Sequence, residues 1–149
     1  MQFGAFLGPH HQLNENPTLA LSRDLELIQL LDDLDYDEVW VGEHHSGGFK
    51  IIPGPEIFIA AAAERTLRIW LGTGAKSFPF HHPLIVADQM VQLDHMTRGR
   101  VMFGAGPGAL PTDASQMGIN PADKRRRMAE ALDAIVPLME GKQVSVETD

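Results

Sequence analysis

The residues best suited to chemistry in this sequence are an acid and two imidazoles at the end of an apolar, strand-like run. The run at 39–41 leads through Gly42 into Glu43, His44 and His45, and a glycine-rich loop follows. A histidine side chain titrates near neutral pH, so it can act as a general acid or base. Because adjacent strand residues point to opposite faces, only one of the two histidines can face a given pocket. The pattern alone leaves open which one does so.

Four short apolar runs predict the strands that position these groups, at residues 2–7, 38–43, 68–73 and 100–105. A helical pattern follows each run: from Asn16, over 55–65, from Pro83 to just before Gly99, and from Asn120 to Gly141. The capping residues at these ends are typical of helix boundaries. The alternation predicts parallel βα units in a single α/β domain over residues 1–149, with no internal boundary. Residues 142–147 then alternate like a half-exposed strand.

The loops that follow parallel strands meet at one edge of the sheet, where ligands bind. Gly74 and Ala75 would leave backbone open to a flat, aromatic ligand, although such residues also form tight turns. The glycine-rich run at 104–108 lacks the G-x-G-x-x-G spacing of a dinucleotide loop. No helix is expected to open there, since the next N-cap residue is Asn120.

Three histidine pairs, at 10/11, 44/45 and 81/82, raise the question of a metal site. The spacing within each pair is unsuited to two ligands on one strand face, and neither H-x-H nor H-E-x-x-H occurs. No metal site is therefore predicted, and His81 and His82 are expected to help start the helix at Pro83. A metal-dependent barrel hydrolase that uses the histidine pairs stays open as an alternative.

The composition narrows the class of protein. The net charge of −8 argues against a nucleic-acid partner, and the lack of cysteine excludes disulfides and thiolate chemistry. Neither a secretory signal nor an apolar run long enough to span a membrane is visible. We therefore expect a cytoplasmic protein without a membrane partner.

Taken together, these residues resemble the bacterial luciferase-like flavin monooxygenases. The likeness covers the whole chain and rests on Glu43-His44-His45, Gly72-Thr73-Gly74-Ala75, residues 87–100 and 103–108, and Met117-Gly118. Residues 40–48 and 106–111 look most similar to the limonene 1,2-monooxygenase branch of that family.

The resemblance implies a (β/α)8 TIM barrel, of which about four βα units, the N-terminal half-barrel, are present. It implies reduced FMN (FMNH2) as cofactor, with O2 and a small hydrophobic substrate, for which a terpene such as limonene is the example. His44 corresponds to the family's catalytic residue, and an unusual cis peptide is expected at Gly74 and Ala75. The residues expected to bind the cofactor are Gly8, His10, Glu43, Thr73, Gly74, Ala75, Gly104 and Gly106. Pro107 departs from the pattern, because some family members have a phosphate-binding arginine there.

Partners follow from the same reasoning. The resemblance implies a separate flavin reductase. A half-barrel would expose the inner face of its strands and two sheet edges, so we expect a homo-oligomer or association with a complementary C-terminal half. A half-barrel that only associates, without catalytic activity, is a further alternative to the enzyme.

Overall fold

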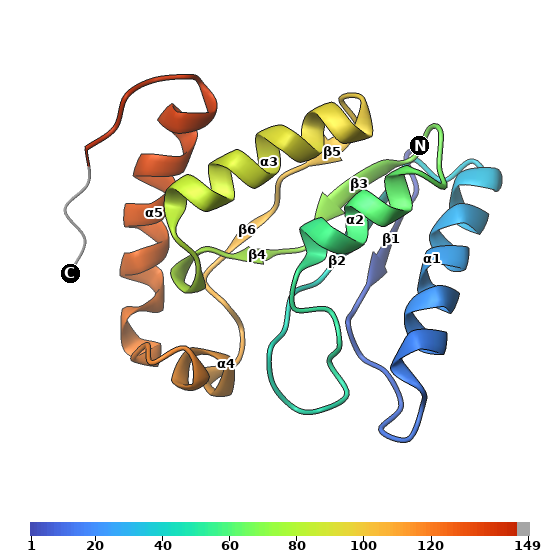
Figure 1. The fold of residues 1–149 in the computed structure, drawn as a ribbon, viewed down its shortest axis with the longest axis horizontal. Coiled ribbons are helices and arrows are strands. Elements are labelled where there is room, and N and C mark those ends of the chain that lie inside the picture. Colours follow the sequence, from blue (N-terminus) through green and yellow to red (C-terminus); the bar gives the residue numbers. More distant parts are fainter. Residues whose placement is uncertain (146–149) are drawn as a thin grey trace.

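Residues 1–145 are described by a computed structural model, shown in Figure 1. The strands are β1 (Gly4–Leu7), β2 (Glu38–Val41), β3 (Trp70–Thr73), β4 (Lys76–Ser77), β5 (Val101–Met102) and β6 (Ala105–Gly106). The α-helices are α1 (Pro17–Asp33), α2 (Pro55–Ala63), α3 (Pro83–Thr97), α4 (Pro111–Gln116) and α5 (Lys124–Met139). Two 3-10 turns, η1 (Phe78–Phe80) and η2 (Pro121–Asp123), precede α3 and α5.

The predicted parallel sheet is confirmed. Strands β1, β2, β3 and β5 lie side by side in that order, and every neighbouring pair is parallel. In Figure 1, the helices α1, α2, α3 and α5 follow one another from right to left, and α1–α2, α2–α3 and α3–α5 are in contact. This order is that of an arc of a barrel, with strands inside and helices outside.

Helices α1, α2 and α3 begin where the sequence predicts, whereas the helix predicted from Asn120 begins as η2 and continues as α5 from Lys124. Asn16 and Asn120 each accept a hydrogen bond from the backbone two residues later, and His82 caps α3 in the same way. Helix α3 ends at Arg98 and Gly99, which both have positive φ. The strand expected at 142–147 is wrong for residues 142–145, which form no strand, and its last two residues lie outside the described part of the chain.

The two faces of the sheet are packed differently. Val39, Val41 and Leu71 are buried and join the core beneath the helices. On the opposite face Phe6 is 64% and Trp70 is 47% exposed, because no element among residues 1–145 covers them fully. The face that would line the inside of a closed barrel is therefore open, as expected for a half-barrel.

Two further predictions about the chain beyond residue 100 are wrong. The strand expected at 100–105 is interrupted, because Thr73 Oγ1 both accepts from Gly104 N and donates to Gly104 O, in place of a regular backbone ladder. Beyond this point the chain pairs again as β4 with β6. The segment expected to have no helix before Asn120 contains α4, which begins at Pro111, a residue well suited to a first helical turn.

Candidate active site

A cavity of about 380 Å³ lies at the carboxyl ends of the strands. Its volume is in the range of small-molecule sites, roughly 300–1,000 Å³. It is formed by loops from all parts of the barrel arc, with these lining residues: Phe6, Pro9, His10, Gly42, Glu43, His44, Gly74, Ala75, Ser77, Gly106, Pro107, Gly108 and Ala109. Most of these residues are apolar or glycine, and the residues with polar side chains are His10, Glu43, His44 and Ser77.

Six of the predicted site residues line this cavity: His10, Glu43, His44, Gly74, Ala75 and Gly106. The other three, Gly8, Thr73 and Gly104, are absent from its wall. Thr73 is fully buried and holds Gly104 by the two hydrogen bonds described above. A side chain on Gly104 would stand 2.0 Å from the Thr73 carbonyl oxygen, so this pair supports the wall from behind.

The peptide bond between Gly74 and Ala75 is cis, as predicted. These two residues form part of the wall, with Gly42 beside them. A Cβ on Gly42 would stand 2.9 Å from the Pro9 side chain and 3.5 Å from the Gly74 carbonyl oxygen. The wall is therefore close-packed backbone, and it can accept a flat ligand only because these positions carry small side chains.

His44 is held by a carboxylate that the sequence analysis missed. Its Nδ1 lies 3.0 Å from Asp113 Oδ2, and Asp113 is 1% exposed. Burial alone would raise the pKa of Asp113, but hydrogen bonds from Ser46 and His44 and the charge of His44 lower it below its ordinary value. An ionised Asp113 accepts a hydrogen bond from Nδ1–H of His44, so the other ring nitrogen, Nε2, is left for a ligand.

Asp113 was missed because α4 was not predicted. The signal was present in Pro111 and in an acid within the first turn, a pattern that is typical of a helix start. Thr112 on the same turn contacts Ser46, with 2.9 Å between the hydroxyl oxygens. Helix α4 thus attaches to the loop after β2 at two adjacent positions, and this attachment fixes the orientation of the His44 ring.

His45 has a different partner from His44 and binds Glu43, although β2 ends at Val41 and both histidines lie in the loop after it. The Glu43 side chain is fully buried, and its Oε1 accepts from His45 Nε2 and His81 Nε2, both at 2.8 Å. Its Oε2 accepts from Ser77 N at 3.1 Å and lies 3.5 Å from Lys76 Nζ. Burial would raise the pKa of Glu43, but the hydrogen bonds from both histidines and the charge of Lys76 hold it at about 2.

His10 lies at the mouth of the cavity, above His44. The two rings meet edge to face, with 5.9 Å between their centres. Its loop is anchored by His11, whose Nε2 lies 2.6 Å from Asp24 on α1. Slight burial and the nearby cationic groups, Lys50 first among them, lower the pKa of His10 below its ordinary value, which favours the neutral ring.

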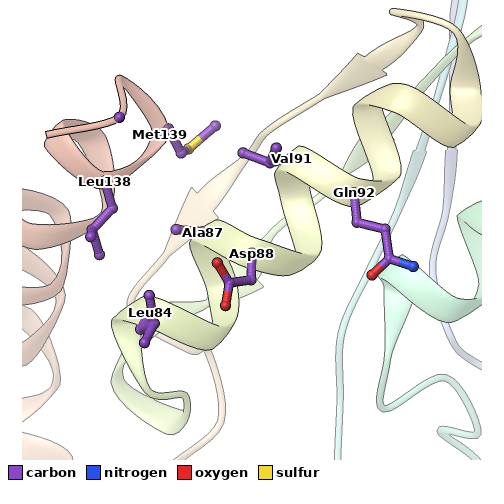
Figure 2. Close-up of a pocket in the computed structure, with 8 residues that line it drawn as sticks. Leu84, Ala87, Asp88, Val91, Gln92, Leu138 and Met139 are labelled. Carbon is purple, nitrogen blue, oxygen red and sulfur yellow. The ribbon is translucent and has the colours of Figure 1, made fainter.

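A second cavity, of about 410 Å³, lies between α3 and the end of α5. Figure 2 shows Leu84, Ala87 and Val91 of α3 facing Leu138 and Met139 of α5 across it. It is a groove on the outer, helical side of the sheet. Its polar side chains are Asp88 and Gln92, and it contains no imidazole. The chemistry therefore points to the cavity at the strand ends.

The fold and this site define a segment of a parallel (β/α) barrel with a histidine site at its carboxyl edge. Residues 1–149 match the family described as "Luciferase-like monooxygenase", and the chain belongs to that family. No helix among the described residues is both long and apolar enough to cross a membrane.

Named relatives agree with this assignment. The chain is 53% identical to limonene 1,2-monooxygenase of Rhodococcus erythropolis over 149 residues, which is all of this chain and 38% of that protein. It is 57% identical to 4-hydroxyprotoasukamycin monooxygenase of Streptomyces nodosus subsp. asukaensis over 143 residues, or 96% of this chain and 38% of that protein. The chain thus spans well under half the length of these relatives.

Solved structures show the same fold. Monooxygenase RslO1 from Streptomyces bottropensis superposes with a TM-score of 0.92 at 31% identity, over 100% of this chain and 46% of that one. The oxygenating constituent of 3,6-diketocamphane monooxygenase from Pseudomonas putida, solved in complex with FMN, gives 0.88 at 26% identity, over 93% and 39%. These matches confirm a partial TIM barrel, and they give no support to a metal-dependent hydrolase.

Proposed function

We propose that this chain carries the catalytic histidine and the flavin-facing wall of an FMN-dependent monooxygenase. The enzyme would use reduced FMN and O2 to insert one oxygen atom into a small hydrophobic substrate. We take limonene as the representative substrate. The observation that carries the proposal is the His44–Asp113 pair on a cavity walled by Gly74 and Ala75. Support also comes from the identity to limonene 1,2-monooxygenase and from the FMN complex of a structural neighbour.

The cavity suits a flavin ring in shape and chemistry. Its small residues expose a flat wall of backbone, and a Cβ on Gly42 or Gly74 would press on the Pro9, Phe6 or Trp40 side chains and disturb that wall. We propose that His10, Gly74, Ala75 and Gly106 contact the cofactor, with Glu43 in the wall. Gly8, Thr73 and Gly104 would hold that surface in place from behind.

When bound, reduced FMN supplies two electrons, so one oxygen atom of O2 enters the substrate and the other leaves as water. The chain's own contribution is proton control at His44. Asp113 fixes Nδ1–H, so Nε2 is the atom that holds or takes a proton at the reacting centre. The apolar residues Phe6, Pro9 and Ala109 limit water around it and favour a hydrocarbon substrate.

One relative suggests how the reduced flavin arrives. The flavin-dependent trigonelline monooxygenase of Acinetobacter baylyi is named as an oxygenase component and is 34% identical over 119 residues, which are 78% of this chain and 33% of that protein. We propose that this chain likewise receives reduced FMN from a separate flavin reductase.

A single-turnover experiment tests the catalytic assignment. The chain is mixed anaerobically with reduced FMN and limonene, O2 is added, and oxygenated product is measured by mass spectrometry. His44→Gln is expected to lower product formation at least about 100-fold, the usual size of a lost acid–base group. His95→Gln, at an exposed position on α3, serves as the matched control. Equal product from His44→Gln and wild type would refute the role of His44, whereas flavin binding without any product would favour the inactive half-barrel.

The positioning role of Asp113 needs a separate variant. Asp113→Asn keeps the shape of the side chain but removes the charge that holds the His44 proton. We expect slower oxygen transfer with unchanged FMN affinity, because Asp113 is not in the cavity wall. If FMN affinity fell and the transfer rate did not, Asp113 would instead shape the flavin site.

A further inference from the structure

Glu43, His45 and His81 form a cluster that the catalytic role of His44 leaves unused. One ligand-type atom from each residue lies within 4.8 Å of the others. The two Nε2 atoms converge on the same carboxylate oxygen, Oε1, at 2.8 Å each. Two imidazoles, from the loop after β2 and from the residue after η1, are therefore already gathered around one carboxylate oxygen.

We propose that Glu43, His45 and His81 bind a divalent transition-metal ion, with Zn²⁺ as the representative ion. Two imidazole nitrogens and one carboxylate oxygen are a donor set that Zn²⁺ accepts, with the remaining position open to water. Around a tetrahedral Zn²⁺, with bonds of about 2.0–2.1 Å, donor atoms stand roughly 3.3 Å apart. Each Nε2–Oε1 distance of 2.8 Å would therefore widen by about 0.5 Å, and Glu43 Oε1 would move off the line of the two Nε2 atoms so that the ion can enter between the three donors.

The ring protons of His45 and His81 can move from Nε2 to Nδ1, which frees the Nε2 atoms to bind the ion. In the arrangement without metal, Nε2–H of each ring donates to Glu43. Metal binding needs the Nε2 lone pair, so each proton must shift to Nδ1. Among the described residues, neither the Nδ1 of His45 nor that of His81 has a hydrogen-bond partner that would oppose this change of tautomer.

Access and charge also permit an ion. The side chains of His45 and His81 are 13% and 23% exposed, so an ion and its water can reach them, whereas Glu43 is fully buried. Lys76 lies 3.5 Å from Glu43 Oε2, but it also pairs at 3.0 Å with Glu56, which offsets its charge. Glu43 would bind through Oε1 alone, since Ser77 N holds Oε2.

Zinc titration of the chelator-treated chain by calorimetry, without flavin, tests this site. We expect one Zn²⁺ per chain, and at least about tenfold weaker binding in His45→Ala and in His81→Ala, because loss of a ligand costs at least as much as loss of an outer-shell partner. His95→Ala, which removes an exposed imidazole elsewhere, should bind as wild type does. Circular dichroism checks the fold of each variant, and the more exposed His81 gives a usable result if His45→Ala does not fold.

Cobalt gives a second readout. Co²⁺ at this site should produce visible absorption of the four- or five-coordinate kind, and His81→Ala should lose it. No zinc binding by the wild-type chain, or zinc binding that both variants retain, would overturn the proposal. Because no flavin is present, either outcome leaves the proposed monooxygenase function to its own test.

Discussion

Replacing Glu43 with glutamine should cost the folded chain about 3 kcal/mol at pH 7. The folded structure lowers the pKa of this carboxyl from 4.5 to about 2. Each pKa unit corresponds to about 1.36 kcal/mol, which gives this figure. Glutamine keeps the size of the side chain, but it is uncharged and cannot accept from His45, His81, Ser77 and Lys76 together.

The effect should depend on pH with a definite sign. Because the pKa of Glu43 is lowered on folding, its stabilisation is complete above pH 4.5 and is lost as the pH falls through about 2. Urea unfolding of wild type and Glu43→Gln at a series of pH values measures this difference. Glu64→Gln, at an exposed position beyond α2, is the control and should differ little from wild type. A difference between wild type and Glu43→Gln that stayed the same from pH 7 to the acid end would refute the electrostatic explanation.

Three further predictions concern the fold. Arg100→Ala should lower the free energy of unfolding, measured with urea, by about 2–4 kcal/mol, because the guanidinium donates to four backbone carbonyls that end or follow α2, precede β3 and end α3. Arg125→Ala, at an exposed site, is its control. Gly104→Ala should lower the free energy of unfolding by several kcal/mol, since a Cβ would stand 2.0 Å from the Thr73 carbonyl oxygen. A thermal unfolding midpoint equal to that of wild type would contradict this geometry. Exposure of Phe6 and Trp70 on the open sheet face predicts association, so light scattering should show a dimer or larger species, and a monomer at micromolar concentration would count against it.

Strands β1, β2 and β3 and helices α1, α2, α3 and α5 could be predicted because their signals are local. Apolar runs and residues such as Asn16 and Asn120 act within a few positions of themselves, and the structure confirms them. The end of the expected strand at 100–105 could not be predicted, because it depends on Thr73, a residue about thirty positions away that competes for the backbone of Gly104.

The candidate site likewise has a part that the sequence predicted, the histidines after β2, and a part that it did not, their partners. Strand alternation separated His44 from His45, and the family resemblance selected His44. The partners of these residues come from elsewhere in the chain: Asp113 from a helix that was not predicted, and His81 from a different histidine pair. The spacing within each histidine pair therefore gave no information about a metal site, because the proposed ligands His45 and His81 come from two different pairs.

Amide chemical shifts during an FMN titration of the nitrogen-15-labelled chain test the central claim most directly, since they locate even weak binding. The flavin site proposed here predicts saturable shifts confined to the loops around residues 8–10, 42–46, 73–77 and 104–109. Shifts should be absent from the groove between α3 and α5, around Val91 and Met139. No saturable shifts, or shifts centred on that groove, would contradict a flavin site at the strand ends beside His44.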